Sequence, residues 1–249
     1  MQYLLVHAVD EELAAAMSGD GTAQASGPSG GAAAPALAAW LDETVSRGVN
    51  LHGSRLCPIS DATTVKVRRG ELVVTDGPFA ETKEQVADYD LLECSDLEEA
   101  VEWASRHPTA QIGAIEVRPL YGDEPPQGLP EPAPGRRRYL MLVCTDPDVE
   151  RDEPGPITPV EPWVEEMGGR GVRRFGSRLD EPVRARTVRV RDGQALVTDG
   201  PFAETKEQIA GFDILDCADL DEAIEVAGKH PMARHGLLEV RPFWPFQKD

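Results

Sequence analysis

The sequence predicts an α+β protein built from two copies of one unit, with the order strand, helix, strand, hairpin, strand, helix, strand. The first observation behind this prediction is a long repeat, because VTDGPFAETKEQ at Val74–Gln85 returns unchanged at Val197–Gln208. An offset of 123 residues superposes Trp40–Pro119 on Trp163–Pro242 without a gap. The second observation is that segments of alternating apolar residues are followed by segments with helical spacing. A period this long indicates a tandem domain duplication rather than a solenoid.

The first part of the unit predicts a strand, a helix and a second strand. Gln2–Ala8 is a mainly apolar run that predicts a strand. Pro35–Arg47 predicts a helix, because proline stands near its start and Gly48 follows its end. Val49–Cys57 predicts the next strand.

The middle of the unit predicts a hairpin and a further strand. Thr63–Arg69 alternates like a half-buried strand, and Glu71–Thr75 returns after the letters RRGE. The second copy has RDGQ at this turn, and Asp-Gly is a strong hairpin signal. Val86–Cys94 predicts the strand that follows the DGPF letters.

The unit ends with a helix and a strand. The letters SDLEEAVEWASRHP predict a helix with Ser95 or Asp96 as its cap and apolar residues along one face. Ile112–Arg118 predicts the last strand. This order of elements is that of a ferredoxin-like split unit. Helices cover one face of such a sheet and the other face is apolar, so we expect the two sheets to pack face to face.

The repeat also sets the expected domain boundaries. The first domain covers residues 1–120, a Pro-rich linker covers 121–138, and the second domain covers 139–249. The first strands match at an offset of 136, so the first copy has thirteen extra residues, which lie within 18–35. This segment is rich in Gly, Ala, Ser and Pro and buries little apolar area, so we expect a flexible loop.

Charge and hydropathy argue against several classes of function. The formal net charge of −19 argues against broad nucleic-acid contact, because phosphate binding uses clustered Lys and Arg, and against an anionic membrane surface. No apolar run approaches the roughly 20 residues of a membrane span. The first residues also lack the pattern of a secretory signal. We therefore expect a cytoplasmic protein without nucleic-acid or membrane partners.

No metal or cofactor is expected. The cysteines, Cys57, Cys94, Cys144 and Cys217, form no CxxC pair, and no two histidines have metal-ligand spacing. The cysteines are expected to act as small apolar residues in a reducing compartment. The sequence has no phosphate loop, nucleophile elbow or dinucleotide fingerprint.

The repeated DGPF run leaves two interpretations open. In the first interpretation the run is a structural turn, because Asp, Gly and Pro all favour turns, and Phe79 and Phe202 anchor the loop in the core. Alternatively, the run lines a ligand site in which Asp76 or Asp199 acts as a general base.

Recurring cations are candidate ligand-binding residues. Lys83 and Lys206 stand among carboxylates in ETKE, a cluster that holds a ligand near a cleft or forms a weak ion-pair network on a surface. Arg55 and Arg178 recur in GSRL and are candidates for binding a ligand carboxylate.

Two other recurring pairs are expected to be structural. Arg118 and Arg241 recur in EVRP, where we expect each to pair with the glutamate two residues before it. Trp40 and Trp163 lie on the first helix of each copy and are expected in the core.

Histidines are the remaining candidates for proton transfer. His52 has Phe175 as its counterpart, so either the position is a packing site or the first copy alone keeps a proton-transfer group there. His107 and His230 recur before proline at a helix end, where a protonated imidazole would cap the helix and a neutral one would act as a general base. The two histidines without counterparts are expected to be incidental, namely His7 and His235.

The run VTDGPFAETKEQ, followed by DLEEAVEWASRHP and IEVRPL, resembles the DGPF-domain branch of the YCII-related proteins. The resemblance covers nearly all of each copy and implies a ferredoxin-like unit that pairs into a dimeric α/β barrel, here within one chain. Some YCII-related proteins are small lyases that use a His on the first helix and an Asp in a DP turn before the last strand. The helix positions here read APALAAW and VEPWVEE, and the turns read His107-Pro108 and His230-Pro231, so this dyad is missing from both copies.

The leading hypothesis is a small-molecule enzyme or ligand-binding protein with clefts near the DGPF segments. If the chain is an enzyme, elimination or isomerisation by proton transfer fits best, because Asp, His and Arg suffice for it without a cofactor. The alternative is a non-enzymatic regulatory or interaction module, because DGPF proteins resemble products encoded beside extracytoplasmic-function sigma factors. We expect a monomeric pseudo-dimer or a homodimer of it.

Overall fold

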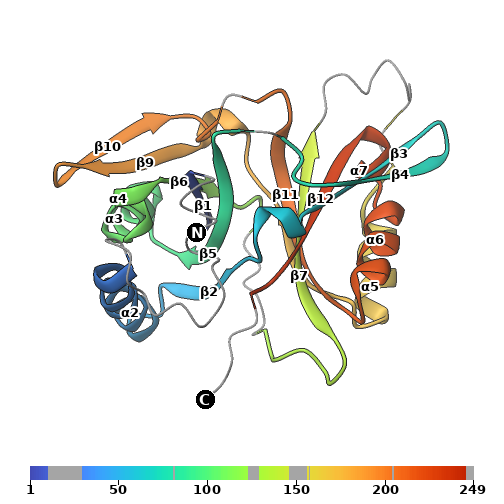
Figure 1. Ribbon diagram of the computed structural model, residues 1–249, viewed down its shortest axis with the longest axis horizontal. Coiled ribbons are helices and arrows are strands. Elements are labelled where there is room, and N and C mark those ends of the chain that lie inside the picture. The colour runs from blue at the N-terminus through green and yellow to red at the C-terminus, as the bar shows by residue number, and fades with distance from the viewer. Residues whose placement is uncertain are drawn as a thin grey trace. The chain divides into compact units, whose positions relative to one another are not determined.

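The computed structural model describes residues 1–10, 30–80, 82–122, 129–145, 156, 158–203 and 205–244. Its strands form two antiparallel sheets of six strands each, and helices connect several of them (Figure 1). The α+β class with two ferredoxin-like units is therefore confirmed, whereas the packing of both sheets into one barrel stays a prediction. Most of the insertion at 18–35 and part of the linker at 121–138 lie outside the described residues.

The chain divides into two compact units that differ from the two sequence copies. Unit 1 contains Met1–Pro58, Thr82–Pro125 and Asp180–Glu204. Unit 2 contains Ile59–Glu81, Pro126–Leu179 and Thr205–Asp249. Each unit therefore holds most of one copy together with a segment of the other.

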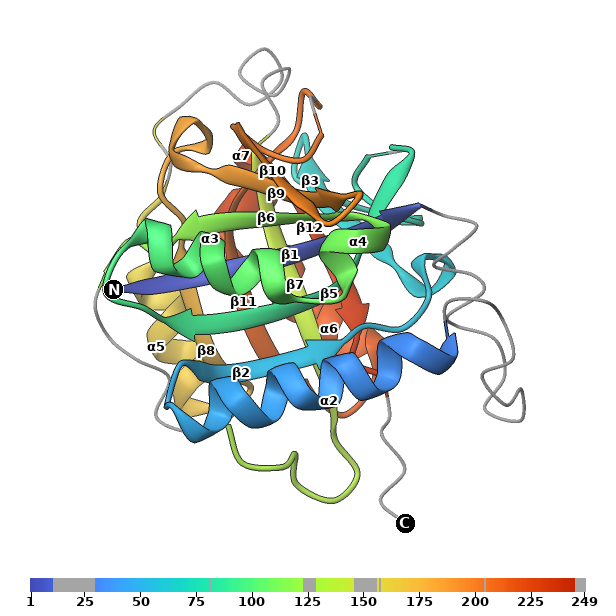
Figure 2. The ribbon, with the colours of Figure 1, turned by 90° about the vertical axis from the view of Figure 1, so that its left-hand side faces the viewer.

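Unit 1 is a sheet with its helices on one face (Figure 2). The strand order is β10-β9-β6-β1-β5-β2. The strands are β1 Gln2–Asp10, β2 Asn50–Arg55, β5 Glu84–Glu93, β6 Ala114–Pro119, β9 Arg186–Arg191 and β10 Gln194–Asp199. The helices are α2 Gly30–Ser46, α3 Leu97–Arg106 and α4 Thr109–Ile112, with a 3-10 turn at Pro182–Arg184. Tyr3, Leu5 and Ile115 of the sheet form a core with Trp40 of α2 and Trp103 of α3.

Unit 2 repeats this plan. Its strand order is β4-β3-β12-β7-β11-β8. The strands are β3 Thr63–Arg68, β4 Glu71–Asp76, β7 Arg137–Thr145, β8 Arg173–Arg178, β11 Gln208–Cys217 and β12 Gly236–Pro242. The helices are α5 Glu161–Gly169, α6 Leu220–Lys229 and α7 Met232–His235, with a 3-10 turn at Ile59–Asp61. Tyr139, Met141 and Leu238 of the sheet form a core with Trp163 of α5 and Val226 of α6.

The core positions predicted for the two tryptophans are confirmed. Trp40 and Trp163 are 4% and 5% exposed. The indole N–H of Trp40 donates to the Trp103 carbonyl at 3.0 Å, and that of Trp163 donates to the Val226 carbonyl at 3.1 Å. Each indole thus joins the first helix of its copy to the second helix, because a buried N–H needs an acceptor.

Each unit completes its sheet with a hairpin from the other sequence copy. The hairpin β9–β10 belongs to the second copy but pairs with β6 of the first, where Ile115 lies opposite Val188. The hairpin β3–β4 belongs to the first copy but pairs with β12 of the second, where Leu238 lies opposite Val65. The sequence predicted both hairpins but not this exchange, because alternation and turn residues do not specify which distant sheet edge a strand joins.

The predicted hairpin turns are confirmed by their backbone angles. Arg69 and Gly70 have φ values of 55° and 81°, and Asp192 and Gly193 have φ values of 53° and 74°. Two consecutive residues with positive φ are typical of the type I′ turn, whose twist matches that of the flanking strands.

The helix predicted at α3 is confirmed with its cap, whereas α2 begins earlier than predicted. Asp96 caps α3, since its side chain accepts from the Glu99 N–H at 2.9 Å. The helix α2 begins at Gly30 rather than at Pro35, because the alanines between them favour helix. The short helices α4 and α7 were not predicted, since four residues are too few to show helical periodicity. Among the described residues, no helix combines the length and apolar character needed to cross a bilayer.

Candidate active site

A cluster of titratable side chains lies in unit 1, between the sheet and its helices, and all of its members except the half-buried Asp88 are buried. His7 on β1 lies opposite Asp88 on β5, and Asp90 follows on the same face of β5. His107 comes directly after α3, and its ring lies 4.3 Å from the ring of His7. The ring of Trp40 on α2 lies 4.6 Å from His107 and closes the cluster on the helix side.

Asp90 lies at the centre of this cluster. Its Oδ2 lies 3.1 Å from His7 Nε2 and 4.0 Å from His107 Nε2. Its Oδ1 accepts a hydrogen bond from the Asn50 amide at 2.9 Å. Burial raises the pKa of Asp90 to about 6, although His107 and Asn50 act in the opposite direction. At neutral pH Asp90 is therefore an ionised carboxylate.

A glycine on the neighbouring strand makes room for this carboxylate. Gly53 lies opposite Asp90, and a Cβ at position 53 would lie 2.0 Å from Asp90 Oδ1. The second copy has the same arrangement, with Gly176 beside Asp213 at an equal distance. The glycine of the GSRL letters is thus required for close approach of a carboxylate rather than for a turn.

His7 is the residue of the cluster with the largest unsatisfied hydrogen-bonding capacity. It is fully buried, and in the described part of the chain neither of its ring nitrogens has a hydrogen-bond partner. The 3.1 Å approach of Nε2 to Asp90 is therefore close but poorly aligned. Burial lowers the pKa of His7 to about 4, against the effect of Asp88. His7 is accordingly a neutral imidazole at physiological pH.

Asp88 extends the cluster toward the end of β2. Its Oδ1 is enclosed and has no hydrogen-bond partner among the described residues. Burial raises the pKa of Asp88, whereas the nearby His7 and Arg55 lower it. Arg55 lies opposite Asp88 in the register of β2 and β5 and is half-buried. The structure therefore brings the predicted ligand-binding Arg55 to the edge of the cluster.

His107 has a defined tautomer because of the backbone next to it. Its Nδ1 accepts from the Thr109 N–H at 3.2 Å, so the neutral ring carries its proton on Nε2, which faces Asp90. Burial lowers the pKa of His107 to about 3, and that of His230, whose Nδ1 accepts from the Met232 N–H at 3.1 Å, to about 4. The interpretation of these histidines as protonated caps is therefore wrong, because desolvation keeps both rings neutral.

The same tautomer bears on metal binding. His7, Asp90 and His107 place one possible ligand atom each within 4.8 Å of one another. A metal ion needs a nitrogen lone pair, and the Nε2 of His107 carries a proton as long as Nδ1 accepts from the backbone. Only His7 and Asp90 then remain as ligands, so the arrangement fits acid–base chemistry better than a three-ligand metal site.

The second copy has a different set of residues at the equivalent positions. Val143 lies opposite Gly211 where the first copy has His7 opposite Asp88. Arg173 stands in the place of Asn50, and its Nε donates to Asp213 Oδ1 at 2.6 Å. Burial raises the pKa of Asp213 to about 6, and Arg173 opposes the shift. Unit 2 thus contains an ion pair where unit 1 contains a titratable cluster.

His52 belongs to a separate pair on the other face of the unit 1 sheet. Tyr89 stands between Asp88 and Asp90 on β5, so its side chain points to the opposite face. The Tyr89 hydroxyl lies 2.8 Å from His52 Nδ1, and the two rings stack at 5.7 Å. The counterpart in unit 2 is a pair of phenylalanines with ring centroids 5.9 Å apart, Phe175 and Phe212. His52 is therefore not part of the His7 cluster.

The aspartates of the DGPF run lie at the exposed ends of the exchanged hairpins. Asp76 ends β4 and is exposed. Asp199 ends β10 with its side chain 86% exposed, and Arg186 Nε lies 3.2 Å from its Oδ1. The structure does not bury these carboxylates as it buries Asp90.

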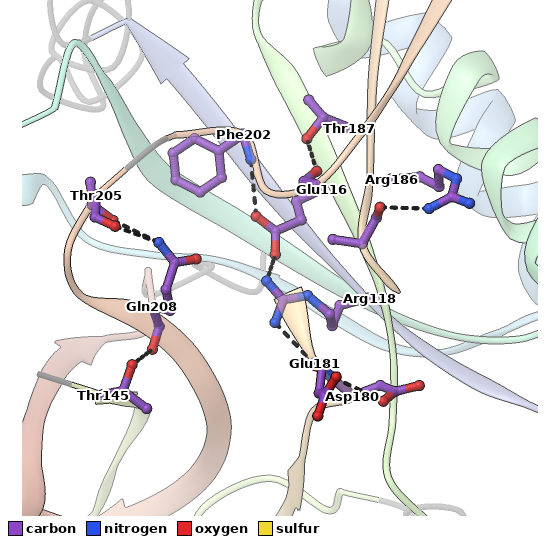
Figure 3. Close-up of polar contacts among 12 residues, drawn as sticks. Glu116, Arg118, Thr145, Asp180, Glu181, Arg186, Thr187, Phe202, Thr205 and Gln208 are labelled. Atoms are coloured by element: carbon purple, nitrogen blue, oxygen red, sulfur yellow. Dashed lines mark hydrogen bonds and ion pairs between the residues drawn. The ribbon is translucent and has the colours of Figure 1, made fainter. Parts of the chain in front are cut away.

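The remainder of each run forms a turn that is anchored on a buried glutamate. The Phe202 N–H donates to Glu116 Oε2 at 3.1 Å, and Figure 3 shows this carboxylate between Phe202 and Arg118. The Phe79 N–H donates to Glu239 at 3.0 Å in the same way. Gly77 and Gly200 have φ values of 101° and 92°, as the turn interpretation requires. The phenylalanine rings themselves are half-buried.

The predicted ion pairs of the EVRP letters are confirmed. Arg118 pairs with Glu116, and Arg241 pairs with Glu239. All four side chains are at most 2% exposed.

The other predicted cations lie at the surface. Lys83 is 89% exposed and lies 3.9 Å from Asp10. Lys206 and Arg178 are also exposed. The glutamates at positions 81 and 204, which the sequence places beside these lysines, lie outside the described residues.

The cysteines are free thiols, and three of them are buried. Burial raises the pKa of Cys94 and of Cys217 to about 12. These thiols are therefore poor nucleophiles.

Most of the His7 cluster was not predicted from the sequence. His7 was considered incidental because it has no counterpart histidine, and the two aspartates lie in an apolar strand. A signal was present in the paired differences between the copies, since positions that meet in the fold change together. These differences are His7 and Val143, Asp88 and Gly211, and Asn50 and Arg173.

Comparison with known proteins gives the family of the chain. The model of the YCII-related domain matches residues 1–122 and 139–247. An uncharacterized protein of Rhizobium meliloti (strain 1021) is 48% identical over 68 residues, which are 26% of this chain. The match spans 55% of that relative's length. Since the domain model matches both halves, the chain belongs to the YCII-related domain family and carries the domain twice.

Proposed function

We propose that this chain is a small-molecule proton-transfer enzyme in which His7 is the general base and Asp90 orients it. The observation that carries the proposal is the state of His7, which is fully buried, neutral and 3.1 Å from an ionised carboxylate. A base that is held beside a carboxylate but lacks a hydrogen bond of its own is suited to take a proton from a ligand.

Proton transfer at His7 follows from its two ring nitrogens. We place the proton of neutral His7 on Nε2, because this nitrogen lies 3.1 Å from Asp90 Oδ2, and this placement leaves the lone pair of Nδ1 as the acceptor. When a ligand C–H gives its proton to Nδ1, the ring becomes an imidazolium and Asp90 stabilises the new charge. Hydrogen bonds of this kind often tighten only in the ligand complex. General-base catalysis contributes roughly 10²–10⁴-fold to a rate.

Asp88 and Arg55 supply the other groups that such a reaction needs. Asp88 stands opposite His7 with one carboxylate oxygen that has no hydrogen-bond partner among the described residues, and burial raises its pKa, so this carboxyl is suited to exchange a proton with the leaving group or with a developing oxyanion. Arg55 stands opposite Asp88 and is only half-buried, so it is suited to hold the carboxylate of an incoming ligand. An elimination or an isomerisation of a small carboxylic acid uses these roles and no cofactor.

The test converts the first copy to the residues of the second. The variant carries His7→Val, Asn50→Arg and Asp88→Gly, all of which the fold already accommodates in unit 2. Both proteins are incubated in D₂O with small carboxylic acids that have an acidic C–H, and deuterium uptake is followed by NMR. We expect exchange with the wild-type protein and a loss of at least about 10²-fold in the variant.

The matched control changes the second copy. His230→Asn keeps an acceptor for the Met232 N–H and leaves unit 1 untouched, so exchange should persist. A folded triple variant that exchanges as fast as the wild type would exclude His7 as the base. The alternative of a regulatory module linked to a sigma factor stays a prediction.

A further inference from the structure

The exchanged hairpins are held by contacts that recur in both units. In unit 1 the Arg191 guanidinium donates to the carbonyls of Ala110 at 3.0 Å and of Gln111 and Gly113 at 3.2 Å. These carbonyls lie at the end of α4, where the helix has no partners of its own for them. An arginine of the second copy thus caps a helix of the first.

Unit 2 contains the reciprocal contact. The Arg68 guanidinium donates to the Ala233 carbonyl at 3.1 Å and to the Gly236 carbonyl at 3.0 Å. These carbonyls belong to α7 and to the residue that follows it. Arg68 and Arg191 are equivalent residues of the two hairpins, and each donates to carbonyls at the end of a short helix of the other copy.

The DGPF run makes the second recurring contact. Glu116 and Glu239 are each 1% exposed, and the arginine two residues later binds one oxygen of each carboxylate. The other oxygen accepts the N–H of a phenylalanine from the opposite copy, Phe202 or Phe79. A buried carboxylate needs partners for both oxygens. Each copy thus supplies a buried acceptor that the hairpin of the other copy satisfies.

We propose that the DGPF run and the EVRP letters are the two halves of one self-recognition interface, through which a YCII-related copy binds the hairpin of a second copy. Both halves are identical in the two copies because each copy presents both of them. The recognised partner is a β-hairpin that adds to the free edge of β6 or β12 and is followed by a DGPF turn. This inference does not use the proton-transfer proposal. The Glu116 contact lies on the face of the sheet opposite His7, whereas the Arg191 contact is to α4, whose Thr109 N–H bonds His107.

The inference predicts that the two copies stay together without their covalent link. The test places a protease site in the linker at residues 123–128 of the full chain and cleaves it after folding. Native mass spectrometry and size exclusion then report whether the halves remain one particle of 27.0 kDa. The urea concentration at which the cleaved halves dissociate measures the stability of their association. We expect the cleaved wild type to remain one particle in the absence of urea.

Two pairs of variants isolate the contacts. Glu116→Ala with Glu239→Ala removes both buried acceptors, and Arg68→Ala with Arg191→Ala removes the carbonyl caps. The matched control, Glu98→Ala with Asp221→Ala, removes exposed acids at equivalent positions of the two copies. We expect the halves of both interface variants to separate at a lower urea concentration than those of the control.

Hydrogen exchange in the uncleaved chain gives a reading that does not depend on dissociation. In Glu116→Gln the amide of Phe202 should exchange at least tenfold faster than in the wild type, while the amide of Phe79 should not change. Cleaved wild-type halves that separate without urea would overturn the proposal. Interface variants that separate at the same urea concentration as the control, with unchanged exchange at Phe202, would overturn it as well.

Discussion

The two copies have the same order of strands and helices, but they differ in the polar side chains that lie between the sheet and the helices. In the first copy Asp90 is near His7 and His107, and in the second Asp213 is paired with Arg173. A guanidinium keeps its charge at any ordinary pH, so the Arg173 pair is a fixed one. An imidazole can take up and release a proton. Equivalent positions of the two copies therefore hold a permanent ion pair in the second copy and a candidate for proton transfer in the first.

The features that the copies share are structural. Gly53 and Gly176 make room for the two carboxylates, and the imidazoles of His107 and His230 accept backbone N–H groups at the start of the next helix. Repeated residues therefore mark what the fold requires. The residues that differ between the copies change the titratable groups around Asp90 and Asp213.

The largest effect on the rate of proton exchange is expected when His7 is replaced by its counterpart in the second copy. His7→Val should lower the rate of deuterium exchange into a substrate by roughly 10²–10⁴-fold, because the general base is removed. Val143→His in the second copy should leave the rate unchanged, since Arg173 still pairs with Asp213 there. The measurement is the initial rate of exchange by NMR. A His7→Val protein with the wild-type rate would require a base elsewhere.

The second-largest effect is on the free energy of unfolding, and it is expected to differ between the partners of Asp213 and of Asp90. Arg173→Ala leaves Asp213 buried without its cation and should lower the free energy of unfolding by about 3–5 kcal/mol at pH 7. Asn50→Ala removes a neutral donor from Asp90 and should cost about 1–3 kcal/mol. Urea unfolding at pH 7 measures both. Equal losses would mean that Arg173 contributes no more than a neutral hydrogen bond.

The pH dependence of the Arg173→Ala loss has a definite sign. The folded pKa of Asp213 is already raised to about 6, and loss of the cation that lowers it raises it further. A carboxyl with a raised folded pKa destabilises the fold once it ionises, so the loss should shrink as the pH falls from the higher folded pKa of the variant toward about 6, and should not change further below that pH. A loss that grows toward pH 5 would contradict this assignment.

A smaller effect is expected from the buried histidines. The folded pKa of His230 is lowered from 6.5 to about 4, so its contribution is complete above pH 6.5 and is lost as the pH falls toward 4. His230→Asn keeps the acceptor and should remove about 3 kcal/mol of this pH dependence. His107→Asn should do the same, with the loss continuing toward pH 3. Urea midpoints from pH 7 to pH 4 measure the slope, and an unchanged slope would mean that the imidazole is not buried as a neutral group.

The smallest effect is expected at the lysines of the DGPF run. Lys83 is 89% exposed, so Lys83→Ala and Lys206→Ala should each change the free energy of unfolding by no more than about 0.5 kcal/mol. Thermal unfolding measures this difference. A small ligand that is retained by the wild type and by Lys206→Ala, but lost from Lys83→Ala, would instead favour the ligand-site interpretation of the run in the first copy.

Local chemistry allowed much of the fold to be predicted from the sequence. The letters RRGE and RDGQ predicted turns that the positive φ values of Gly70 and Gly193 confirm. Asp96 stands where a cap is needed before α3 and accepts the predicted kind of hydrogen bond. These features depend on neighbours within a few residues, which is why a sequence pattern is sufficient for them.

The duplication, the order of strands and helices, the hairpin turns and the family resemblance can be read from the sequence, because each depends on short-range patterns or on the repeat. The sheet that each hairpin joins and the polar side chains that come into contact are visible only in the folded structure. His7, Asp88 and His107 come from distant parts of the first copy and lie together only because β1 pairs with β5 and α3 ends over them. The tertiary structure also decided that His7 is neutral, because burial rather than sequence position sets its pKa.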